Sequence, residues 1–579
     1  MFKLPSQRQS LKTILSPIFL ALVIGSLAGL GAVAFKFLLM FGIDLLWAGD
    51  GAFCHRFAAA PWYLQLAIPC LAGLVVGPVI TWLAPELRGP GVPEVMEAMA
   101  LSEGRIRGRV VLLKTAVTAL MISAGGSLGR EGPIVQIGSS IGSTITSLFH
   151  LSTEQRRLAV ACGAAAGIAA TFQAPMAGTL FVVEILLFDL EVVSLSNIVI
   201  AAVTGTLISR PFLHETSIFT IPEFSLNHSA ELGLYLGLGL MAGFLSLLLM
   251  LAVFSLPRLY ERLRVPAWFT PACGGLLVGC VGLVMPRALG VGYESINDAL
   301  AGHLSLSLVL LILFWKLVAT GFSLGSGMSG GIFAPSLVLG AMLGSCVGYL
   351  AQVLWPEQAI FPAYYALIGM GAVVSGTTLA PITAILTIFE LTYSYQVILP
   401  LMVACIASLL VVRFFHGYSI YETKLHLRGV HIVRGHDVNL LRSMWVADYM
   451  DREFQTIDED TKLSEVIAQV ERSLFPHFLV LDKGGLLTGV LTLRDLKGVM
   501  AHPEQLQSGM CAADFMSRNL VTVNEHDDME RVFHLFAEHP YTLMPVVRAN
   551  NPRKAVGVIR EASLVTAYGE HVLKQDLHS

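Results

Sequence analysis

Apolar segments cut by glycine and proline make up most of the chain between residues 11 and 415. A bilayer lets only helices and closed barrels satisfy their backbone polar groups, and a spanning helix needs about 20 apolar residues. Several of these segments are shorter than that, so they predict helices that break inside the membrane. Only 13% of the 579 residues are charged, against about 25% in soluble proteins. We therefore expect an all-α polytopic membrane domain over residues 1–424.

The membrane part contains an internal repeat. Its glycines, prolines and charged residues recur in the same order, at offsets that grow from 201 (286 − 85) to 206 (390 − 184). The pairs are Pro85/Pro286, Gly89/Gly290, Gly91/Gly292, Lys114/Lys316, Thr118/Thr320, Gly129/Gly331, Pro133/Pro335, Gly138/Gly340, Pro175/Pro381 and Glu184/Glu390. Duplication followed by small loop insertions leaves this pattern. Interrupted segments at matching positions of two halves predict a binding site near the middle of the membrane.

The motif Gly129-Arg130-Glu131-Gly132-Pro133 places a charged pair inside this apolar region. Pro133 suits the first turn of a helix, and a helix N-terminus carries unpaired N–H donors and the positive end of the macrodipole. Such a terminus attracts an anion, and the Glu131 carboxylate is an anion at the same spot. Intramembrane carboxylates are costly and usually functional. The alternative is a loop carboxylate paired with Arg130.

Basic residues indicate the orientation of the chain. Lys3, Arg8 and Lys12 precede a first apolar run that is too long for a signal peptide, and arginines recur at 105–109 and 156–157. The positive-inside rule places these residues in the cytoplasm. The eight cysteines show no metal-ligand spacing, and a net charge of −4 gives no sign of nucleic-acid binding. We expect a multi-pass protein of a bacterial inner membrane, with both termini cytoplasmic and no bound metal.

The character of the chain changes after Phe415. Residues 425–443 are basic and polar, as in a linker that leaves the membrane. Residues 444–575 alternate short strands with amphipathic helices and contain two copies of one unit, 444–500 and 510–572. The matching segments are 446–450 with 512–516 and 489–491 with 557–559. Two such units that need each other's surface predict one small cytoplasmic α/β domain.

The motifs of the membrane part resemble the CLC family of chloride channels and proton-coupled anion exchangers. The family's Gly-Ser-Gly-Ile-Pro stretch corresponds to residues 89–93, its Gly-Lys/Arg-Glu-Gly-Pro to 129–133 and its Gly-x-Phe-x-Pro to 331–335. The tyrosine near the end of the membrane part corresponds to Tyr421. The resemblance covers residues 11–425 and implies two inverted repeats per subunit, one anion pathway in each subunit and a homodimer.

The resemblance also implies an anion site built from backbone N–H donors, with the tyrosine hydroxyl as a further donor. The residues concerned are Pro90, Gly91, Gly132, Ile332, Phe333 and Tyr421. Glu131 is then the gate: when ionised it fills the anion site, and when protonated it swings aside. Taken alone, Phe333 favours core packing and Tyr421 an interfacial membrane anchor.

Pro90 departs from the family's pattern, because most members have serine there. Proline offers neither a hydroxyl nor an N–H, so the anion loses a hydrogen bond of about 1.5–3 kcal/mol. A weakly hydrated anion such as nitrate suffers less from that loss than chloride does, and Pro90 resembles the plant nitrate exchangers of this family. The alternative is that the proline only shapes the turn before a helix.

Ile185 is the second departure. Proton-coupled members usually carry an inward-facing glutamate at this position, directly after the one that matches Glu184, whereas channels carry an aliphatic residue. Glu131 and Glu184 remain as groups for a proton pathway. The absence of a titratable side chain at 185 favours a voltage- or proton-gated anion channel for chloride, with nitrate as a further substrate. A proton-coupled chloride or nitrate exchanger is the alternative.

The C-terminal part resembles a pair of CBS modules. Thr492 and Asp495 match the family's ribose-binding pattern, which implies an adenine nucleotide on the first module. Arg560 and Ser563 stand at these positions of the second copy. We expect at most one nucleotide site and no cofactor that transport requires. The alternative is a domain that serves only dimerisation.

Two Gly-x-Ser-x-Gly patterns, at 138–142 and 327–331, are compatible with an intramembrane serine hydrolase. A serine nucleophile needs a base within hydrogen-bond reach. The histidines before the linker fall near segment ends or in polar loops, so we expect small residues for helix packing and no enzyme. A membrane sensor without transport is the other rival, and the uninterrupted anion-site motifs disfavour it.

Overall fold

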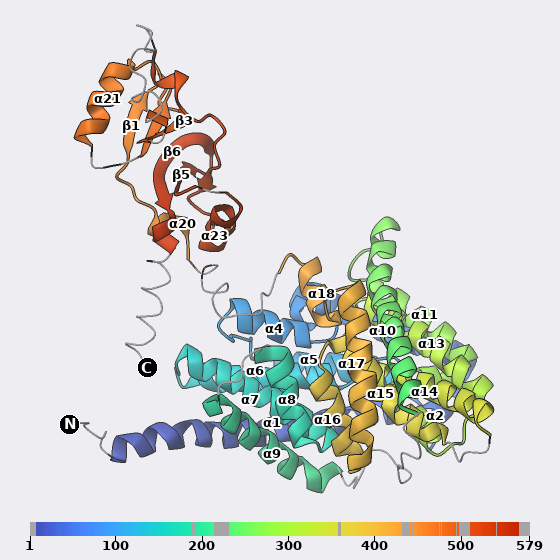
Figure 1. The fold of residues 1–579 in the computed structure, drawn as a ribbon. Helices are drawn as coiled ribbons and strands as arrows, with labels where there is room; N and C mark the ends of the chain where they lie inside the picture. Colours follow the sequence, from blue (N-terminus) through green and yellow to red (C-terminus); the bar gives the residue numbers. More distant parts are fainter. Residues whose placement is uncertain are drawn as a thin grey trace. The chain divides into compact units, whose positions relative to one another are not determined.

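The computed structural model describes residues 7–187, 192–213, 231–356, 361–430, 441, 444–473, 475, 477–493, 495–496, 510–539, 541–564 and 566. The chain divides into two compact units, Met1–His431 and Ile432–Ser579 (Figure 1). The first unit is helical, and the second contains both helices and strands.

Seven helical stretches within the described residues are long and apolar enough to cross a membrane. They are Pro17–Leu46, Trp62–Leu83, Leu195–Leu213, Glu231–Arg262, Leu306–Gly325, Phe333–Leu354 and Tyr395–Leu427. Other apolar helices are shorter: Pro175–Leu187, Thr270–Val284 and Pro381–Thr392. This mixture of long and short helices confirms the predicted polytopic domain with broken helices.

The first half of the unit carries the helices that precede and follow the Glu131 motif. They are α1 (Gln7–Leu46), α2 (Phe53–Ala59), α3 (Trp62–Pro78), η1 (Val79–Leu83), η2 (Pro85–Leu87), α4 (Val92–Leu101), α5 (Arg109–Ser123), α6 (Glu131–Leu148), α7 (Thr153–Phe172), α8 (Pro175–Phe181), η3 (Val182–Leu187) and α9 (Val192–Leu213).

The second half follows the same order. Its helices are α10 (Glu231–Arg262), α11 (Thr270–Val284), η4 (Pro286–Ala288), α12 (Tyr293–Leu300), α13 (Leu306–Gly325), α14 (Phe333–Leu354), α15 (Pro362–Thr378), α16 (Pro381–Thr392), η5 (Tyr395–Val397), α17 (Ile398–Phe415) and α18 (Ile420–Leu427). By the sequence offsets α4 to α8 correspond to α12 to α16, so the repeat predicted from sequence reappears helix by helix.

A local two-fold axis relates the two halves. Gly129 and its repeat partner Gly331 form an antiparallel bridge, in which each N–H donates to the other's carbonyl, at 2.7 and 2.6 Å. Because each glycine pairs with its own repeat equivalent, a local two-fold axis passes between the two residues. Two reciprocal hydroxyl contacts flank the bridge: Thr118 with Ser329 at 2.8 Å, and Thr320 with Ser127 at 2.9 Å. The repeats are therefore inverted, as the family resemblance implied.

Buried lysines fix the turns before α4 and α12. Lys114 is 0% exposed, and its ammonium group donates to the carbonyls of Leu87 and Gly89, both at 3.0 Å. Its repeat partner Lys316 is also 0% exposed and donates to the Gly290 carbonyl at 2.9 Å. Each repeat thus uses a buried ammonium group to hold an irregular turn whose carbonyls no helix satisfies.

The second unit contains two sheets of the same design. The elements of the first copy are α20 (Val446–Tyr449), β1 (Gln455–Asp458), α21 (Leu463–Arg472), β2 (His477–Leu481) and β3 (Leu487–Thr492). Those of the second are η7 (Ala512–Asp514), β4 (Val523–Asn524), α23 (Met529–Glu538), β5 (Leu543–Arg548) and β6 (Asn551–Arg560). In each sheet the first strand pairs parallel with the second, and the second pairs antiparallel with the third.

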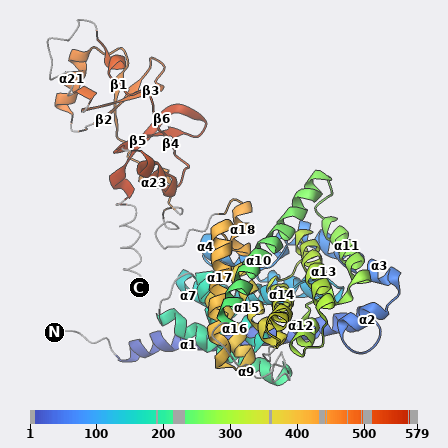
Figure 2. The same cartoon turned by 45° about the vertical axis from the view of Figure 1, so that its right-hand side comes forward.

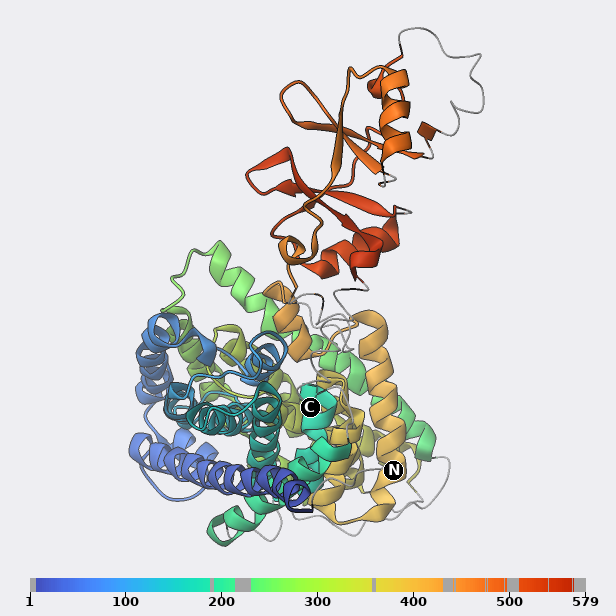
Figure 3. The same ribbon diagram turned by 90° about the vertical axis from the view of Figure 1, so that its left-hand side faces the viewer.

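Each sheet has its own hydrophobic core, and a third hydrophobic cluster is shared by both sheets. Leu463 and Val466 of α21 pack on β1 and β2, and Val532 of α23 packs on β4 and β5 (Figure 2). Leu479 of β2 and Val558 of β6 belong to one further cluster, which joins the two sheets. The two sheets lie side by side in Figure 3. The predicted dependence of each copy on the other's surface corresponds to this shared cluster.

Candidate functional site

Three backbone turns meet at the centre of the first unit. A Cβ atom on Gly132 would lie 2.0 Å from the carbonyl oxygen of Pro90 and 3.3 Å from the Cα atom of Gly331, so only glycine fits there. A Cβ atom on Gly91 would lie 2.9 Å from the carbonyl oxygen of Gly132. The Gly330 N–H donates to the Gly89 carbonyl at 3.2 Å. The structure therefore brings the 89–93, 129–133 and 331–335 motifs into direct contact.

Helix starts point into this contact. Gly91 is the N-cap of α4, Arg130 of α6 and Ile332 of α14, and Phe333 is the first residue of α14. The first N–H groups of a helix have no partner within the helix, and they carry the positive end of its dipole. Convergent helix N-termini suit a small anion held by partial charges.

Glu131 lies inside this convergence, and it is 2% exposed. Its Oε1 atom accepts a hydrogen bond from the Tyr293 hydroxyl at 2.6 Å. Its Oε2 atom is buried and has no hydrogen-bond partner among the described residues. A Cβ atom on Gly129 would lie 2.4 Å from this oxygen and 3.2 Å from the backbone nitrogen of Ala334. The carboxyl group of Glu131 thus lies beside the first turn of α14.

Tyr421 and Phe333 are both buried, at 1% and 3% exposure. Tyr421 follows the N-cap of α18, where Ser419 and Glu422 form a capping box that fixes the start of the helix. Its ring lies within electrostatic reach of Glu131. Because it is enclosed by protein, Tyr421 is not an anchor at the lipid surface. The Phe333 ring packs against Phe172 at 5.4 Å between ring centroids.

An ion-pair cluster ties α18 to the turn that carries Pro90. The Lys424 ammonium group lies 2.5 Å from Glu94 Oε1 of α4 and donates to the Arg88 carbonyl at 2.6 Å. Arg428 reaches the same carboxylate oxygen at 3.3 Å. The Lys424 and Glu94 side chains are 15% and 7% exposed, so this pair is shielded from water.

Glu184 and Glu390 cap helices of the opposite repeat. Glu184 accepts from the backbone N–H groups of Ile382 and Thr383, at 3.2 and 2.8 Å, at the start of α16. Glu390 accepts from those of Met176 and Ala177, at 3.0 and 2.7 Å, at the start of α8.

Both carboxylate oxygens of Glu184 accept hydrogen bonds in its helix cap, so the residue has a structural role. The sequence predicts a role in the proton pathway for the same residue. That second role stays a prediction. Ile185 is 4% exposed and has no group that could carry a proton. Asp189, a second acidic residue close to Glu184 in the sequence, lies outside the described residues.

Tyr293 is the site residue that sequence reasoning missed. It opens α12, and the guanidinium carbon of Arg130 lies 5.1 Å from the centre of its ring. Its repeat equivalent is Val92 (293 − 92 = 201), which has no polar group. The sequence did contain one indication of this role: the start of α12 carries a hydroxyl, whereas the equivalent start of α4 carries an apolar side chain.

The first CBS-like module assembles its predicted pair. The Asp495 Oδ2 atom accepts from the Thr492 N–H at 2.8 Å and from the Thr492 hydroxyl at 2.7 Å. A carboxylate offers about four acceptor positions, so Asp495 keeps capacity for the hydroxyls of a ribose. The structure thus brings Thr492 and Asp495 together, and the nucleotide that the resemblance implies stays a prediction.

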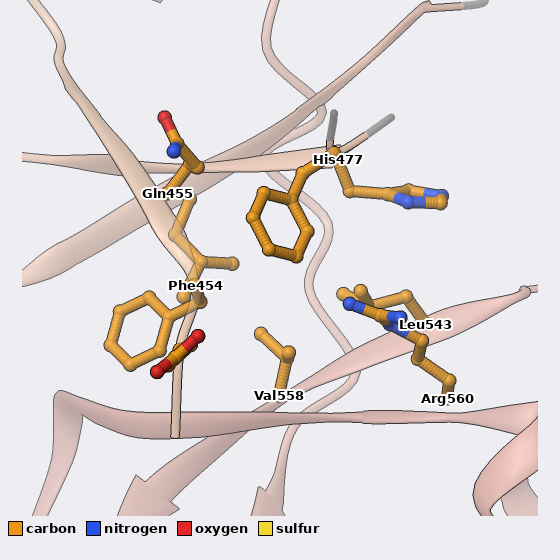
Figure 4. A pocket seen from close by; sticks show the side chains of 9 residues that line it. Phe454, Gln455, His477, Leu543, Val558 and Arg560 are labelled. Atoms are coloured by element: carbon orange, nitrogen blue, oxygen red, sulfur yellow. The ribbon is translucent and has the colours of Figure 1, made fainter. Parts of the chain in front are cut away.

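A pocket within the C-terminal unit is lined by side chains of both copies (Figure 4). The Arg560 guanidinium lies 5.7 Å from the ring centre of Phe475 and 3.4 Å from the Asp451 carboxylate. The cavity that remains measures about 10 Å³, which is room for about one water molecule. Burial and the Arg560 charge lower the pKa of His477, so Arg560 supplies the cationic charge of this cleft at neutral pH. The side chains that leave so little room come from both copies: Phe475 and His477 from the first, and Arg560 from the second.

Comparison with known proteins agrees with this geometry. Residues 72–413 match the family model described as voltage gated chloride channel, and residues 446–502 and 512–570 each match a CBS domain. A putative chloride channel protein ClcB-like of Ralstonia nicotianae is 36% identical over 410 residues, which cover 70% of this chain and 95% of that protein. The H(+)/Cl(-) exchange transporter ClcA of Klebsiella pneumoniae is 34% identical over 430 residues, 72% of this chain and 89% of that protein.

Solved structures share the fold. A slow cyanobacterial Cl⁻/H⁺ antiporter superposes with a TM-score of 0.65 at 27% identity, covering 71% of this chain and 97% of that one. A eukaryotic CLC transporter superposes with a TM-score of 0.63, over 96% of this chain and 98% of the transporter's chain. Its sequence identity is 20%, so this likeness supports the fold alone. The relatives and the family model are those of channels and transporters. With its paired helix starts, its buried glutamate and its two C-terminal modules, this chain belongs to the CLC family of membrane anion-transport proteins and carries a pair of CBS domains.

Proposed function

We propose that this protein exchanges chloride for protons across a bacterial inner membrane, with Glu131 as the shared gate. The observation that carries the proposal is the buried Glu131 carboxylate, which lies among helix N-termini with one oxygen unpartnered in the described part of the chain. The sequence alone favoured a channel. Relatives at 34% identity are named H⁺/Cl⁻ exchangers, and the cyanobacterial neighbour at 27% is an antiporter, so the exchanger has the stronger support.

The proposed cycle uses charge competition at one place. The ionised Glu131 carboxylate is held by the helix N-termini, and it excludes a dissolved anion from the same partial charges. When Glu131 takes up a proton, it loses its charge, and most of its attraction to the helix N-termini is lost with it. The anion then accepts hydrogen bonds from the N–H groups of Gly132, Ile332 and Phe333 and from the Tyr421 hydroxyl. Binding by dipoles without a full cation stays weak enough for release.

The inner proton route of this cycle requires water. Ile185 cannot hold a proton, and the Glu184 oxygens are engaged as a helix cap. An apolar stretch of protein resists carrying charge, so protons from the cytoplasm reach Glu131 along a chain of water molecules in this proposal. Ile185 is also the specific feature that favours the second candidate, a Glu131-gated passive anion channel.

Liposomes with an imposed chloride gradient separate the two functions. An exchanger moves protons uphill as chloride runs down, which a pH electrode records, whereas a channel leaves the protons in place. Glu131→Gln is expected to abolish proton movement and to leave a chloride flux that no longer depends on external pH. Glu154→Gln is the matched control, because Glu154 also lies in the first turn of a helix but is exposed. Chloride flux in Glu131→Gln that still follows external pH would refute the gate.

We further propose a homodimer with both termini in the cytoplasm. The dimer follows from the family resemblance, and the orientation from the basic residues of the N-terminal segment and of the 105–109 loop. Cross-linking in native membranes and protease protection of the C-terminal unit test the two statements separately. Nitrate remains the alternative substrate, because Pro90 removes a donor that chloride needs more.

A further inference from the structure

Tyr293 joins the second repeat to the gate in the first. It is the first residue of α12, directly after Gly292, whose φ of 88° only glycine adopts readily. The next residue, Glu294, accepts from the backbone N–H of Phe53 at 3.0 Å. The buried Lys316 holds the carbonyl of Gly290 at 2.9 Å. The start of α12 is therefore fixed from two sides, and it presents the Tyr293 hydroxyl to Glu131 from a rigid base.

The contact itself is a charge-assisted hydrogen bond. The Tyr293 Oη and Glu131 Oε1 atoms are 2.6 Å apart, within the range of about 2.5–2.7 Å for a hydroxyl that donates to a carboxylate. Tyr293 donates to the Oε1 atom of Glu131, and the Oε2 atom has no hydrogen-bond partner among the described residues. A donor of this kind stabilises the ionised carboxylate more than the protonated acid.

The other polar groups near the gate come from three elements. Arg130, the N-cap of α6, places its guanidinium carbon 5.1 Å from the centre of the Tyr293 ring. Tyr421 of α18 is within electrostatic reach of Glu131. The first turn of α14 contributes backbone N–H groups and the apolar Phe333. The Arg130 guanidinium lies over the Tyr293 ring, which a phenylalanine at this position would retain.

We propose that Tyr293 is a positioning residue whose hydroxyl holds the ionised Glu131 in the closed position and thereby sets the external pH at which the anion pathway opens. This inference rests on the proposed function, because it needs Glu131 to be the gate. Protonation of Glu131 must weaken the bond to Tyr293 before the carboxyl group can leave. Without the hydroxyl, Glu131 takes up a proton more readily, so the pathway opens at a higher pH.

Tyr293→Phe tests the proposal, because it removes the hydroxyl and keeps the ring beneath Arg130. Chloride flux from liposomes is measured over a series of external pH values. The midpoint of the pH dependence is expected to move upward by about one to two pH units, which corresponds to one hydrogen bond to a charged group. The maximal flux at low pH should stay within about twofold, since the anion donors are untouched.

Tyr349→Phe is the matched control. Tyr349 lies on α14 in the same repeat, and its hydroxyl donates to the backbone carbonyl of Leu304 and not to the gate. This variant should keep the wild-type midpoint. If Tyr293→Phe yields too little folded protein, Tyr293→Leu carries the same expectation, since it also lacks the hydroxyl.

Two outcomes would overturn the proposal. One is an unchanged midpoint in Tyr293→Phe. The other is a flux reduced equally at every pH, which would mean that Tyr293 only supports packing. The single variant Glu131→Gln separates this failure from failure of the gate. If Glu131→Gln alone keeps its pH dependence, the proposed function falls. If Glu131→Gln is pH-independent and Tyr293→Phe behaves as wild type, only the role of Tyr293 falls.

Discussion

Replacing Glu184 and, separately, Glu390 by glutamine tests whether the two repeats hold each other through their helix caps. Each carboxylate accepts two backbone N–H groups at the start of a helix in the opposite repeat. Glutamine keeps one acceptor oxygen, so one N–H group loses its partner. Hydrogen bonds to charged groups contribute about 1.5–3 kcal/mol, and both side chains are only partly buried, so water recovers some of the loss. We expect each substitution to cost about 1–2 kcal/mol.

Thermal unfolding of the purified protein in detergent measures the effect. A cost of this size lowers Tm by roughly 2–8 °C if this unit responds as large soluble domains do. Glu184 also accepts from the Thr383 hydroxyl at 2.7 Å, whereas Glu390 faces Ala177 at the matching position. Glu184→Gln should therefore lower Tm at least as much as Glu390→Gln, and the exposed Glu154→Gln should lower it much less. Proton transport in liposomes is recorded for the same variants.

The comparison between the two variants gives the refuting result. A loss of stability in one of them and none in the other would show that reciprocal capping is the wrong description. A loss of proton coupling confined to Glu184→Gln, with stability equal to that of Glu390→Gln, would assign Glu184 to the proton pathway in addition to its cap. Wild-type Tm and unchanged proton coupling in both variants would leave neither role standing.

Two further expectations concern the anion turn and the first CBS module. Pro90→Ser restores an N–H and a hydroxyl beside the anion, so the ratio of chloride to nitrate affinity should rise about tenfold, as one such hydrogen bond predicts. Calorimetry on both anions measures the ratio, and an unaltered value would mean that Pro90 only shapes the turn. Millimolar ATP, ADP or AMP should raise the Tm of the wild-type protein and not that of Asp495→Ala, and a rise that survives the substitution would reject the nucleotide site at Thr492 and Asp495.

The helical repeat was predictable because its signal is local. Glycines and prolines mark the places where membrane helices break or touch, so their order along the chain reports the order of the helices. Gly129 and Gly331 illustrate both the reach and the limit of this signal. Their offset of 202 (331 − 129) identifies them as equivalents, but only the structure pairs them with each other across a two-fold axis.

Contacts between distant side chains were not predictable in the same way. The bond from Tyr293 to Glu131 joins residues 162 positions apart, and the Glu184 cap spans 198. No periodicity encodes which side chain crosses to the other repeat. Glu184 therefore appeared only as a candidate proton carrier, and Tyr293 was not recognised at all. The anion-site residues were named from the resemblance to the CLC family, whose short glycine-containing motifs before helices recur in this sequence.

The cluster around Lys424 has a mechanical consequence. Lys424 binds the Arg88 carbonyl and the Glu94 carboxylate, and it lies one helical turn beyond Tyr421 on α18. The chain continues from the end of this helix into the linker. A movement of α18 that keeps these two bonds therefore also moves the Arg88 carbonyl and the first turn of α4. The position of Tyr421 is in this way coupled to that of the Gly91 turn, although the two lie 330 residues apart in the sequence (421 − 91 = 330).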